Sequence, residues 1–355
     1  MRIKYQSALP AEIQEHFRGL FLDRSQIYVL GLTRHARTLA TLFPVQGFID
    51  DYASDSEFLG RPILRGKEVS RDALIISGVV DGRPLSALRR LRSAGFSKVI
   101  DYFSLYRLAP DLVPPPPFST QNTRDILQNR AKYEWLEKRL ADDESRATLE
   151  KLINFRLNWD LADMEGFSLR LDQQYFEPFM ELASTSVFVD GGGSDGQTSR
   201  TYAQRAPSHR RIYCSEPESG AMQVAKAKLA DLRTLTYVQK GLFSRNGTAR
   251  FNSNASSASG LSAEGDTEIE IVKLDDEVEE SVDYIKLDLE GAECDALDGA
   301  QEHIAQDHPK LAVCVYHDQR DFWRVPERIL AIDEDYEIFL RHYTEGPLET
   351  VMYFK

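Results

Sequence analysis

The sequence has few cysteines, no long apolar run and no apolar leader. The three cysteines, Cys214, Cys294 and Cys314, are widely spaced and form no Cys-x-x-Cys pair, so we expect reduced, buried thiols rather than a disulfide framework. The longest apolar stretch, residues 73–80, is far shorter than the ~20 residues that span a membrane. The N-terminal residues lack the apolar core of a secretory signal. We therefore expect a cytoplasmic protein without a membrane span.

Positive charge is also scarce over most of the chain. The 355 residues include 43 basic and 56 acidic side chains, a net charge of −13. Residues 1–120 carry 16 basic against 12 acidic side chains, whereas residues 121–355 carry 27 against 44. Because phosphate backbones bind clustered Lys and Arg, the acidic later part argues against nucleic acid as a partner.

The length suggests two or three domains. Four consecutive prolines at 114–117 can neither continue a helix nor occupy a central strand, and they predict a linker. The small polar stretch at 253–260 predicts a flexible loop. We expect an α/β protein of two Rossmann-like domains, with the first at 1–110, a proline-rich linker and helical bridge at 111–165, and the second domain at 166–355.

Apolar runs alternate with helical patterns in both predicted domains, which indicates βαβ units and parallel sheets. In the first domain we expect strands at 26–32, 45–51, 73–79 and 98–103, and helices at 36–43 and 84–95. In the second we expect strands at 187–191, 211–216, 235–240, 284–289, 311–317, 336–343 and 348–354. A short Gly-Pro turn separates the last two, which predicts an antiparallel hairpin closing a parallel sheet.

A glycine-rich loop follows the strand at 187–191. Asp190 ends the strand, and Gly191 to Gly193, Ser194, Asp195 and Gly196 lead into a helix. Glycines let a ligand approach the backbone, and a helix N-terminus carries partial positive charge. The loop suits a nucleoside-containing ligand at the carboxyl ends of parallel strands. A glycine-rich turn without a ligand is the structural alternative.

Glu216 ends the next strand, 26 residues after Asp190. An acid at this place can accept hydrogen bonds from the two hydroxyls of a ribose. Its alternative role is that of an exposed acid at a helix start, where the helix dipole also favours negative charge.

Three carboxylates and a histidine follow two later strands. Asp288 and Glu290 lie at the carboxyl end of the strand at 284–289, and Glu293 follows in the first helical turn. His317 ends the strand at 311–317. A general base, an acceptor for sugar hydroxyls or a hard-cation site would use such carboxylates. Imidazole titrates near neutral pH, which suits proton transfer. Glu293 has the alternative role of a helix N-terminal charge, and His317 that of a structural side chain.

The span from about 165 to 355 resembles the FkbM-family methyltransferases, which use S-adenosylmethionine. The resemblance is carried by VFVDGGGSDGQTS, IYCSEPES, VKLDD, DYIKLDLEGAE, the VYH strand end and RHYTEGPLETVMYF, in this order. It implies the seven-stranded sheet of a class I methyltransferase, with the last two strands as an antiparallel hairpin.

The resemblance also implies roles for particular residues. The cofactor would contact Asp190, Gly191, Gly192, Ser194, Gly196, Glu216, Gly241 and Leu242. Within this set Glu216 would hold the ribose, and Gly241 and Leu242 would form the adenine side. Asp288, Glu290 and His317 would face the transferred methyl group as catalytic residues. Whether a metal bridges Asp288 and Glu290 stays open.

The first domain has a weakened dinucleotide motif. The first strand is followed by Gly31, but Thr33 and Ala36 replace the second and third glycines of GxGxxG. A side chain at the second position hinders close approach of a pyrophosphate. Asp50 and Asp51, after the second strand, could still meet a ribose. Otherwise the domain serves docking or substrate selection.

Three functions compete. The first is an S-adenosylmethionine-dependent O-methyltransferase acting on a hydroxyl of a sugar, a polysaccharide precursor or a natural product. The second is an NAD- or nucleotide-sugar-binding oxidoreductase or epimerase that uses the first domain, and the missing glycines count against it. The third is a non-catalytic scaffold. We expect a small-molecule or glycan acceptor as partner, and a homo-oligomer stays open.

Overall fold

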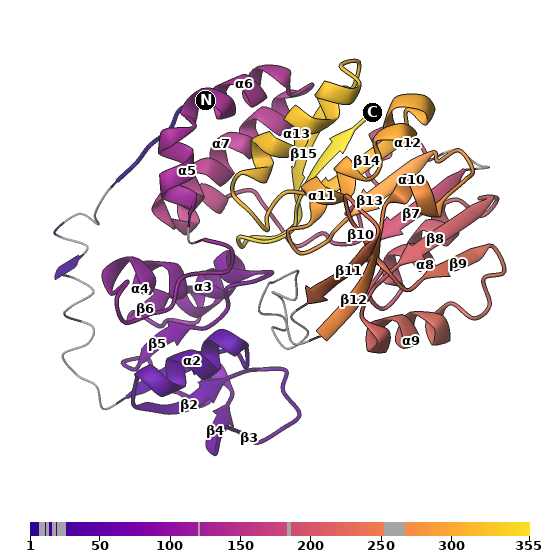
Figure 1. The fold of residues 1–355 in the computed structure, drawn as a ribbon. Coiled ribbons are helices and arrows are strands. Elements are labelled where there is room, and N and C mark those ends of the chain that lie inside the picture. Colours follow the sequence, from indigo (N-terminus) through magenta and orange to yellow (C-terminus); the bar gives the residue numbers. More distant parts are fainter. Residues whose placement is uncertain are drawn as a thin grey trace. The chain divides into compact units, whose positions relative to one another are not determined.

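The computed structural model describes residues 1–6, 11, 14–15, 19, 26–119, 121–182, 186–251 and 267–355 (Figure 1). These residues form two compact units. Unit 1 comprises Met1–Gln128, Ala147–Leu171 and His342–Glu349, and unit 2 comprises Asn129–Arg146, Asp172–Arg341 and Thr350–Lys355. The predicted loop at 253–260 lies outside the described residues.

The sheet of unit 1 has six strands in the order β3-β4-β2-β1-β5-β6. Neighbouring strands run parallel, except that β3 is antiparallel to β4. The strands are β1 (Ile27–Leu30), β2 (Val45–Ile49), β3 (Glu57–Phe58), β4 (Arg61–Leu64), β5 (Leu74–Ser77) and β6 (Val99–Asp101). The four longest apolar runs gave the expected strands. The short strands β3 and β4 were missed because neither is an apolar run.

The starts of two helices of unit 1 have clear local causes. Helix α2 (Arg34–Leu42) begins after Thr33, whose hydroxyl accepts the backbone N–H of Ala36 at 3.1 Å. A Cβ at Gly78 would lie 3.1 Å from Ala36, so the helix packs closely on the turn after β5. Helix α3 (Pro84–Ser93) begins with proline at its first position, where no N–H is needed.

Unit 1 also contains segments that are distant in sequence. Helices α4 (Tyr102–Leu108), α5 (Asn122–Gln128) and most of α7 (Asp143–Asn158) belong to it. Phe103 stacks on Trp159 at 5.7 Å and meets Phe155 edge to face at 5.2 Å. The buried guanidinium of Arg156 donates to the carbonyl of Pro347 at 3.0 Å. The aromatic cluster and this hydrogen bond join the three parts of unit 1.

The main sheet of unit 2 has seven strands in the order β15-β16-β14-β13-β7-β8-β9. Strands β14, β13, β7, β8 and β9 run parallel, and β16 is antiparallel to β14. Glu337 and Lys355 exchange both backbone hydrogen bonds, the pattern of an antiparallel pair. The strands are β7 (Val187–Gly191), β8 (Arg211–Ser215), β9 (Leu235–Val238), β13 (Tyr284–Leu287), β14 (Lys310–Cys314), β15 (Ile338–His342) and β16 (Thr350–Phe354). All seven expected strands and the terminal hairpin are present.

A second sheet of unit 2 was not expected from the sequence. It has the order β10-β12-β11, with β10 (Gly241–Leu242) parallel and β11 (Gly247–Phe251) antiparallel to β12 (Thr267–Val272). Along β12 the apolar Ile269 and Ile271 are buried, whereas Glu268 and Glu270 are exposed. This period-two alternation was the available signal for the strand.

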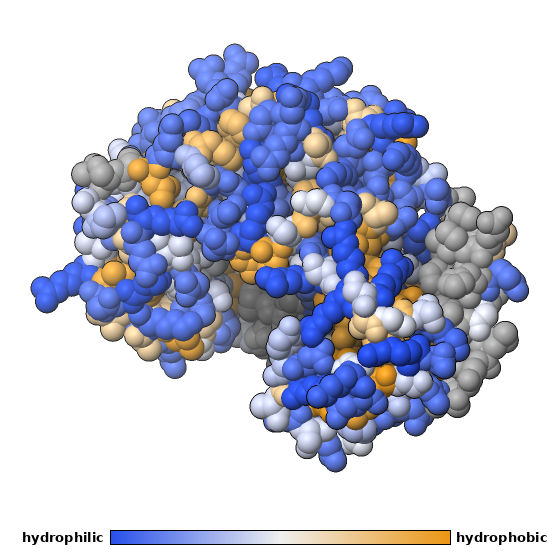
Figure 2. Space-filling view, turned by 180° about the vertical axis from the view of Figure 1, so that it is seen from behind, coloured by the Kyte–Doolittle hydropathy of each residue, from blue (hydrophilic) through white to orange (hydrophobic). Residues whose placement is uncertain are grey.

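Helices cover the main sheet of unit 2 (Figure 1). They are α6 (Arg130–Arg139), α8 (Gln197–Arg205), α9 (Ser219–Lys228), α10 (Leu274–Glu277), α11 (Glu293–Asp298), α12 (Gln301–Asp307) and α13 (Asp321–Ile332). Hydrophilic residues dominate the surface seen in Figure 2. Among the described residues, no helix combines the length and apolar character needed to cross a membrane. All three cysteines are buried, and none of them forms a disulfide.

The proline run is packed into unit 1. The hydroxyl of Tyr102 donates to the carbonyl of Pro114 at 2.9 Å, and Val113 is buried. The chain passes from unit 1 to unit 2 after Gln128 and returns at Ala147, within α7. The domain boundaries expected at 110 and 165 stay a prediction.

Candidate active site

Asp190 and Lys286 form a buried ion pair beneath the glycine-rich loop. The Asp190 side chain is 0% exposed, accepts a hydrogen bond from Ser199 Oγ at 2.7 Å, and lies 3.1 Å from Lys286 Nζ. Lys286 also donates to the carbonyls of Gly191 and Gly192. Burial opposes the charge on Lys286, but Asp190 and Asp288 outweigh it and raise the pKa of the ammonium. Asp190 thus supports the loop from behind.

The loop itself needs glycine for close packing. Gly192 has φ +73°, and a Cβ there would overlap the carbonyl oxygen of Asp288. Gly196 has φ +83°, and a Cβ would lie 2.6 Å from Leu229. The glycines therefore let the loop lie against β13 and α9. From the sequence, the glycines either admit a ligand or form a turn without one, and the close packing supports a structural role.

Glu216 holds the loop and faces a pocket. Its carboxylate accepts the backbone N–H of Ser194 at 3.0 Å and that of Glu218 at 2.8 Å. The residue is only 8% exposed, and burial raises the pKa of its carboxyl, while these two N–H groups act in the opposite direction. Both oxygens are oriented by the backbone, and a carboxylate keeps further lone pairs for a ligand.

A pocket of about 480 Å³, counted with its opening to solvent, lies beside Glu216. Six predicted site residues line it, namely Gly192, Glu216, Gly241, Leu242, Asp288 and Glu290. Pro217, Ile269, Ile271, Leu289 and Ala292 complete the lining. The predicted cofactor residues Asp190, Gly191, Ser194 and Gly196 and the predicted catalytic His317 are not part of it. Ile269 and Ile271 were missed because the small sheet was missed.

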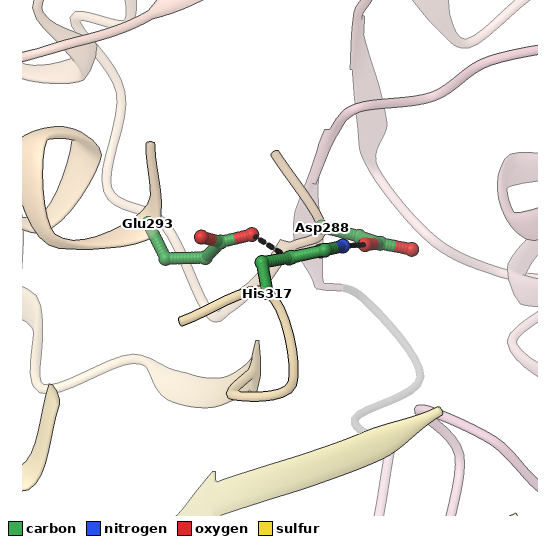
Figure 3. Close-up of side chains that lie close together, drawn as sticks. All are labelled: Asp288, Glu293 and His317. Carbon is green, nitrogen blue, oxygen red and sulfur yellow. Dashed lines mark hydrogen bonds and ion pairs between the residues drawn. The ribbon is translucent and has the colours of Figure 1, made fainter. Parts of the chain in front are cut away.

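His317 lies between the carboxylates of Glu293 and Asp288 (Figure 3). Its Nδ1 is 2.8 Å from Glu293 Oε1. Its Nε2 is 3.6 Å from Asp288 Oδ1 and 3.5 Å from Glu290 Oε2. The imidazole is 1% exposed and the Glu293 carboxylate 0% exposed. The structure thus brings the three predicted catalytic residues together and adds Glu293 as the partner of the second ring nitrogen.

Glu293 also shapes the loop after β13. Its two carboxylate oxygens accept the backbone N–H groups of Leu289 at 2.7 Å and Gly291 at 3.0 Å. Glu290 between them has φ +53°, a left-handed conformation that is uncommon for a residue with a side chain. The Glu293 side chain therefore stabilises the turn that carries Glu290. A helix N-terminal charge alone does not describe this role.

The charge around His317 changes its expected titration. Burial opposes the imidazolium, but Glu293, Asp288 and Glu290 outweigh it and raise the pKa of His317 to about 9. The side chain is therefore protonated at neutral pH, whereas the sequence had suggested titration near neutrality. Burial also acts against the charge of Asp288, but Lys286 and His317 hold the pKa of this carboxyl below its ordinary value.

Two tyrosines orient Asp288, and neither was identified from the sequence. Tyr175 donates its hydroxyl to Asp288 Oδ2 at 2.8 Å, and Tyr316 donates to Oδ1 at 3.3 Å. Tyr175 belongs to the segment before β7, where no periodic signal marks it. Tyr316 is part of the VYH strand end.

The site also offers ligands for a cation. Atoms of Asp288, Glu293 and His317 that can bind a metal lie within 4.8 Å of one another. Since Glu293 already accepts two backbone N–H groups and faces His317 Nδ1, it is better placed to orient His317 than to bind a metal.

Sheet order and pocket position together define an α/β methyltransferase-type domain, because the site lies at the carboxyl ends of β7, β8 and β13. Residues 175–343 match the family model described as the methyltransferase FkbM domain. These residues are therefore similar to the FkbM methyltransferase domain.

A solved structure supports the same fold over almost the whole chain. The methyltransferase FkbM from Methylobacillus flagellatus KT is 23% identical, with a TM-score of 0.76, and the match covers 98% of this chain and 94% of that chain. A putative rRNA-methylase from Clostridium thermocellum is 11% identical, with a TM-score of 0.33 and 48% and 84% coverage. At this TM-score the two folds are not shown to be alike. No curated protein sequence matches the chain.

Proposed function

We propose that the protein is an S-adenosylmethionine-dependent O-methyltransferase that acts on a hydroxyl of a sugar, a polysaccharide precursor or a natural product. The observation that carries the proposal is one pocket that joins Glu216, Gly241 and Leu242 to Asp288 and Glu290. Methyltransferase activity follows from the family.

The pocket residues fit the cofactor. Gly192 presents backbone without a side chain because its α-carbon lies against the Asp288 carbonyl. Glu216 offers a preoriented carboxylate to ribose hydroxyls. The apolar Leu242, Ile269 and Ile271 form a wall suited to a flat base. S-adenosylmethionine supplies an electrophilic methyl group on a positively charged sulfur, and the carboxylates of Asp288 and Glu290 favour positive charge nearby.

Glu290 is the better candidate for the general base. A sugar hydroxyl is a weak nucleophile, and a positioned base contributes roughly 10²–10⁴-fold. His317 is protonated at neutral pH because its pKa is about 9, so its resting form donates a proton and does not accept one. Glu290 lines the pocket, and its Oε2 lies 3.5 Å from His317 Nε2. In this proposal Glu290 takes the hydroxyl proton, and His317 and Glu293 orient it.

The acceptor class rests on the family and on charge. Residues 121–355 carry 27 basic against 44 acidic side chains, which disfavours a polyanionic nucleic acid. A neutral small molecule or glycan meets no such repulsion.

Titration with S-adenosylhomocysteine tests the cofactor site. We expect the full chain to bind it with a micromolar dissociation constant and Glu216→Ala to bind it at least tenfold more weakly, because two ribose hydrogen bonds to a charged group are lost. Glu302→Gln, an exposed glutamate outside the pocket, is the matched control and should bind like the wild type. No binding by the wild type would contradict the proposal.

A further inference from the structure

Unit 1 has a pocket of its own at the carboxyl ends of β1, β2 and β5. The space between its lining residues is about 660 Å³, counted with its opening to solvent. Strand β1 lies between β2 and β5, so the chain leaves the centre of the sheet in opposite directions on its two sides. Ligands of open α/β sheets bind in the crevice at such a switch in strand order.

One side of this pocket is an apolar slot. Val79, Ala87, Leu91 and Phe96 line it. Leu91 and Phe96 are almost fully buried, and the guanidinium of Arg71 covers the Phe96 ring at 4.3 Å. The slot is therefore lined by groups that are held in place, as a flat heterocyclic ring requires.

The other side carries two fixed carboxylates. Asp50 Oδ1 accepts the backbone N–H groups of Tyr52 at 2.8 Å and Ala53 at 2.9 Å. Asp51 accepts the N–H of Gly66 at 2.9 Å and the guanidinium of Arg90 at 2.5 Å. Ionised carboxylates have about four acceptor positions each, so both can accept further hydrogen bonds from a ligand that offers adjacent hydroxyls.

Thr33 closes the place where a dinucleotide would put its pyrophosphate. Its hydroxyl donates to the carbonyl of Gly78 at 2.6 Å and accepts the N–H of Ala36 at 3.1 Å. The side chain therefore occupies the turn that glycine leaves open in dinucleotide sites. The slot and the carboxylates remain available, but the pyrophosphate cradle does not.

We propose that this pocket binds a nucleoside, with the base in the apolar slot and the 2′- and 3′-hydroxyls of the ribose on Asp50 and Asp51. The site is separate from the methyl-transfer pocket and does not depend on the function proposed for that pocket. Unit 1 would then bind a ligand of its own. Because Thr33 occupies the place of the pyrophosphate, this ligand is a nucleoside and not NAD.

Titration of the full-length chain with adenosine, uridine and 2′-deoxyadenosine tests this site. Glu216→Ala serves as the background, so that ribose binding in unit 2 is weakened. We expect saturable binding of adenosine or uridine, and at least tenfold weaker binding of 2′-deoxyadenosine than of adenosine if the purine is preferred. Asp50→Asn keeps the Oδ1 acceptor of the turn and should weaken ribonucleoside binding about tenfold.

Two further variants separate the site from general damage. Ala87→Phe fills the slot and should abolish binding, whereas Asp55→Asn, an exposed aspartate outside the pocket, should leave it unchanged. Thermal unfolding of each variant checks that unit 1 is intact. The proposal is overturned if neither nucleoside binds, or if binding is unchanged in both Asp50→Asn and Ala87→Phe.

Discussion

At the scale of single residues, His317 takes its charge from the carboxylates around it. The pKa of an isolated imidazole is 6.5, and here it is raised to about 9. A folded-state pKa above the unfolded value stabilises the fold fully below pH ~6.5, and this contribution is lost as the pH rises through about 9. The shift corresponds to about 3 kcal/mol of free energy of unfolding.

Glu293→Gln tests this coupling. Glutamine can still accept from His317 Nδ1, but its charge is gone, so we expect the pKa of His317 to fall by at least one unit. NMR titration of the histidine ring protons measures it. The loss of stability between pH 6.5 and 9 should shrink in the same variant, and Glu302→Gln should leave both unchanged. An unaltered titration midpoint in Glu293→Gln would contradict the assignment.

Asp190 and Lys286 form an ion pair in the interior and do not line the pocket. Each is almost completely buried, and their side chains lie 3.1 Å apart. Removing one partner would leave the other charge unpaired in the interior, which typically costs about 3–5 kcal/mol. Their positions are therefore set by each other and by the loop carbonyls that Lys286 binds.

At the scale of elements, strand β12 supplies one wall of the unit 2 pocket that Glu216 and Asp288 also line. Its inward side chains Ile269 and Ile271 line the pocket, and Glu268 and Glu270 point outward. Only the apolar face of the strand therefore meets the pocket.

Ile269→Ser should weaken S-adenosylhomocysteine binding about tenfold, because roughly two methylenes of apolar contact are lost at ~0.8 kcal/mol each. Glu270→Gln on the outward face of the same strand is the matched control. Calorimetric titration measures both. Equal affinities of the two variants for S-adenosylhomocysteine would show that its adenine does not lie against β12.

At the scale of the whole molecule, unit 1 is not a continuous piece of sequence. Glu345, in the segment between β15 and β16, accepts hydrogen bonds from the backbone N–H and the hydroxyl of Ser86 at 2.7 and 2.5 Å. Ser86 lies in the first turn of α3, which has no side-chain cap of its own. A residue from the end of the chain thus caps a helix of the first sheet.

A fragment of residues 1–128 should therefore be less stable than unit 1 in the full chain. It lacks Phe155 and Trp159, which pack on Phe103, as well as the Glu345 cap. We expect a lower midpoint of thermal unfolding and exposure of apolar surface to a fluorescent dye. In the full chain, Glu345→Ala should cost about 1 kcal/mol. A fragment as stable as unit 1 in the full chain would contradict this view.

Local patterns were sufficient for the strands and helices that carry strong periodicity. The apolar runs ending at Asp190, Glu216 and His317 gave strand order along the chain and placed these residues near one sheet edge. Strands β3 and β10 were not predicted because two residues carry no periodicity. Strands β4 and β11 lack a continuous apolar run, and the alternation of β12 rests mainly on Ile269 and Ile271. For the same reason one wall of the pocket was missing from the sequence prediction.

The sequence by itself determined the class of the chain, because alternating apolar strands and helices can bury their faces only in layered α/β sheets. It also placed Glu216, Asp288, Glu290 and His317 at strand ends. Only the tertiary structure decided that Lys286 pairs with Asp190 and that the carboxylates around His317 raise its pKa. It also decided that residues 342–349 complete unit 1. These features depend on distances between groups far apart in the chain, and burial sets their energies.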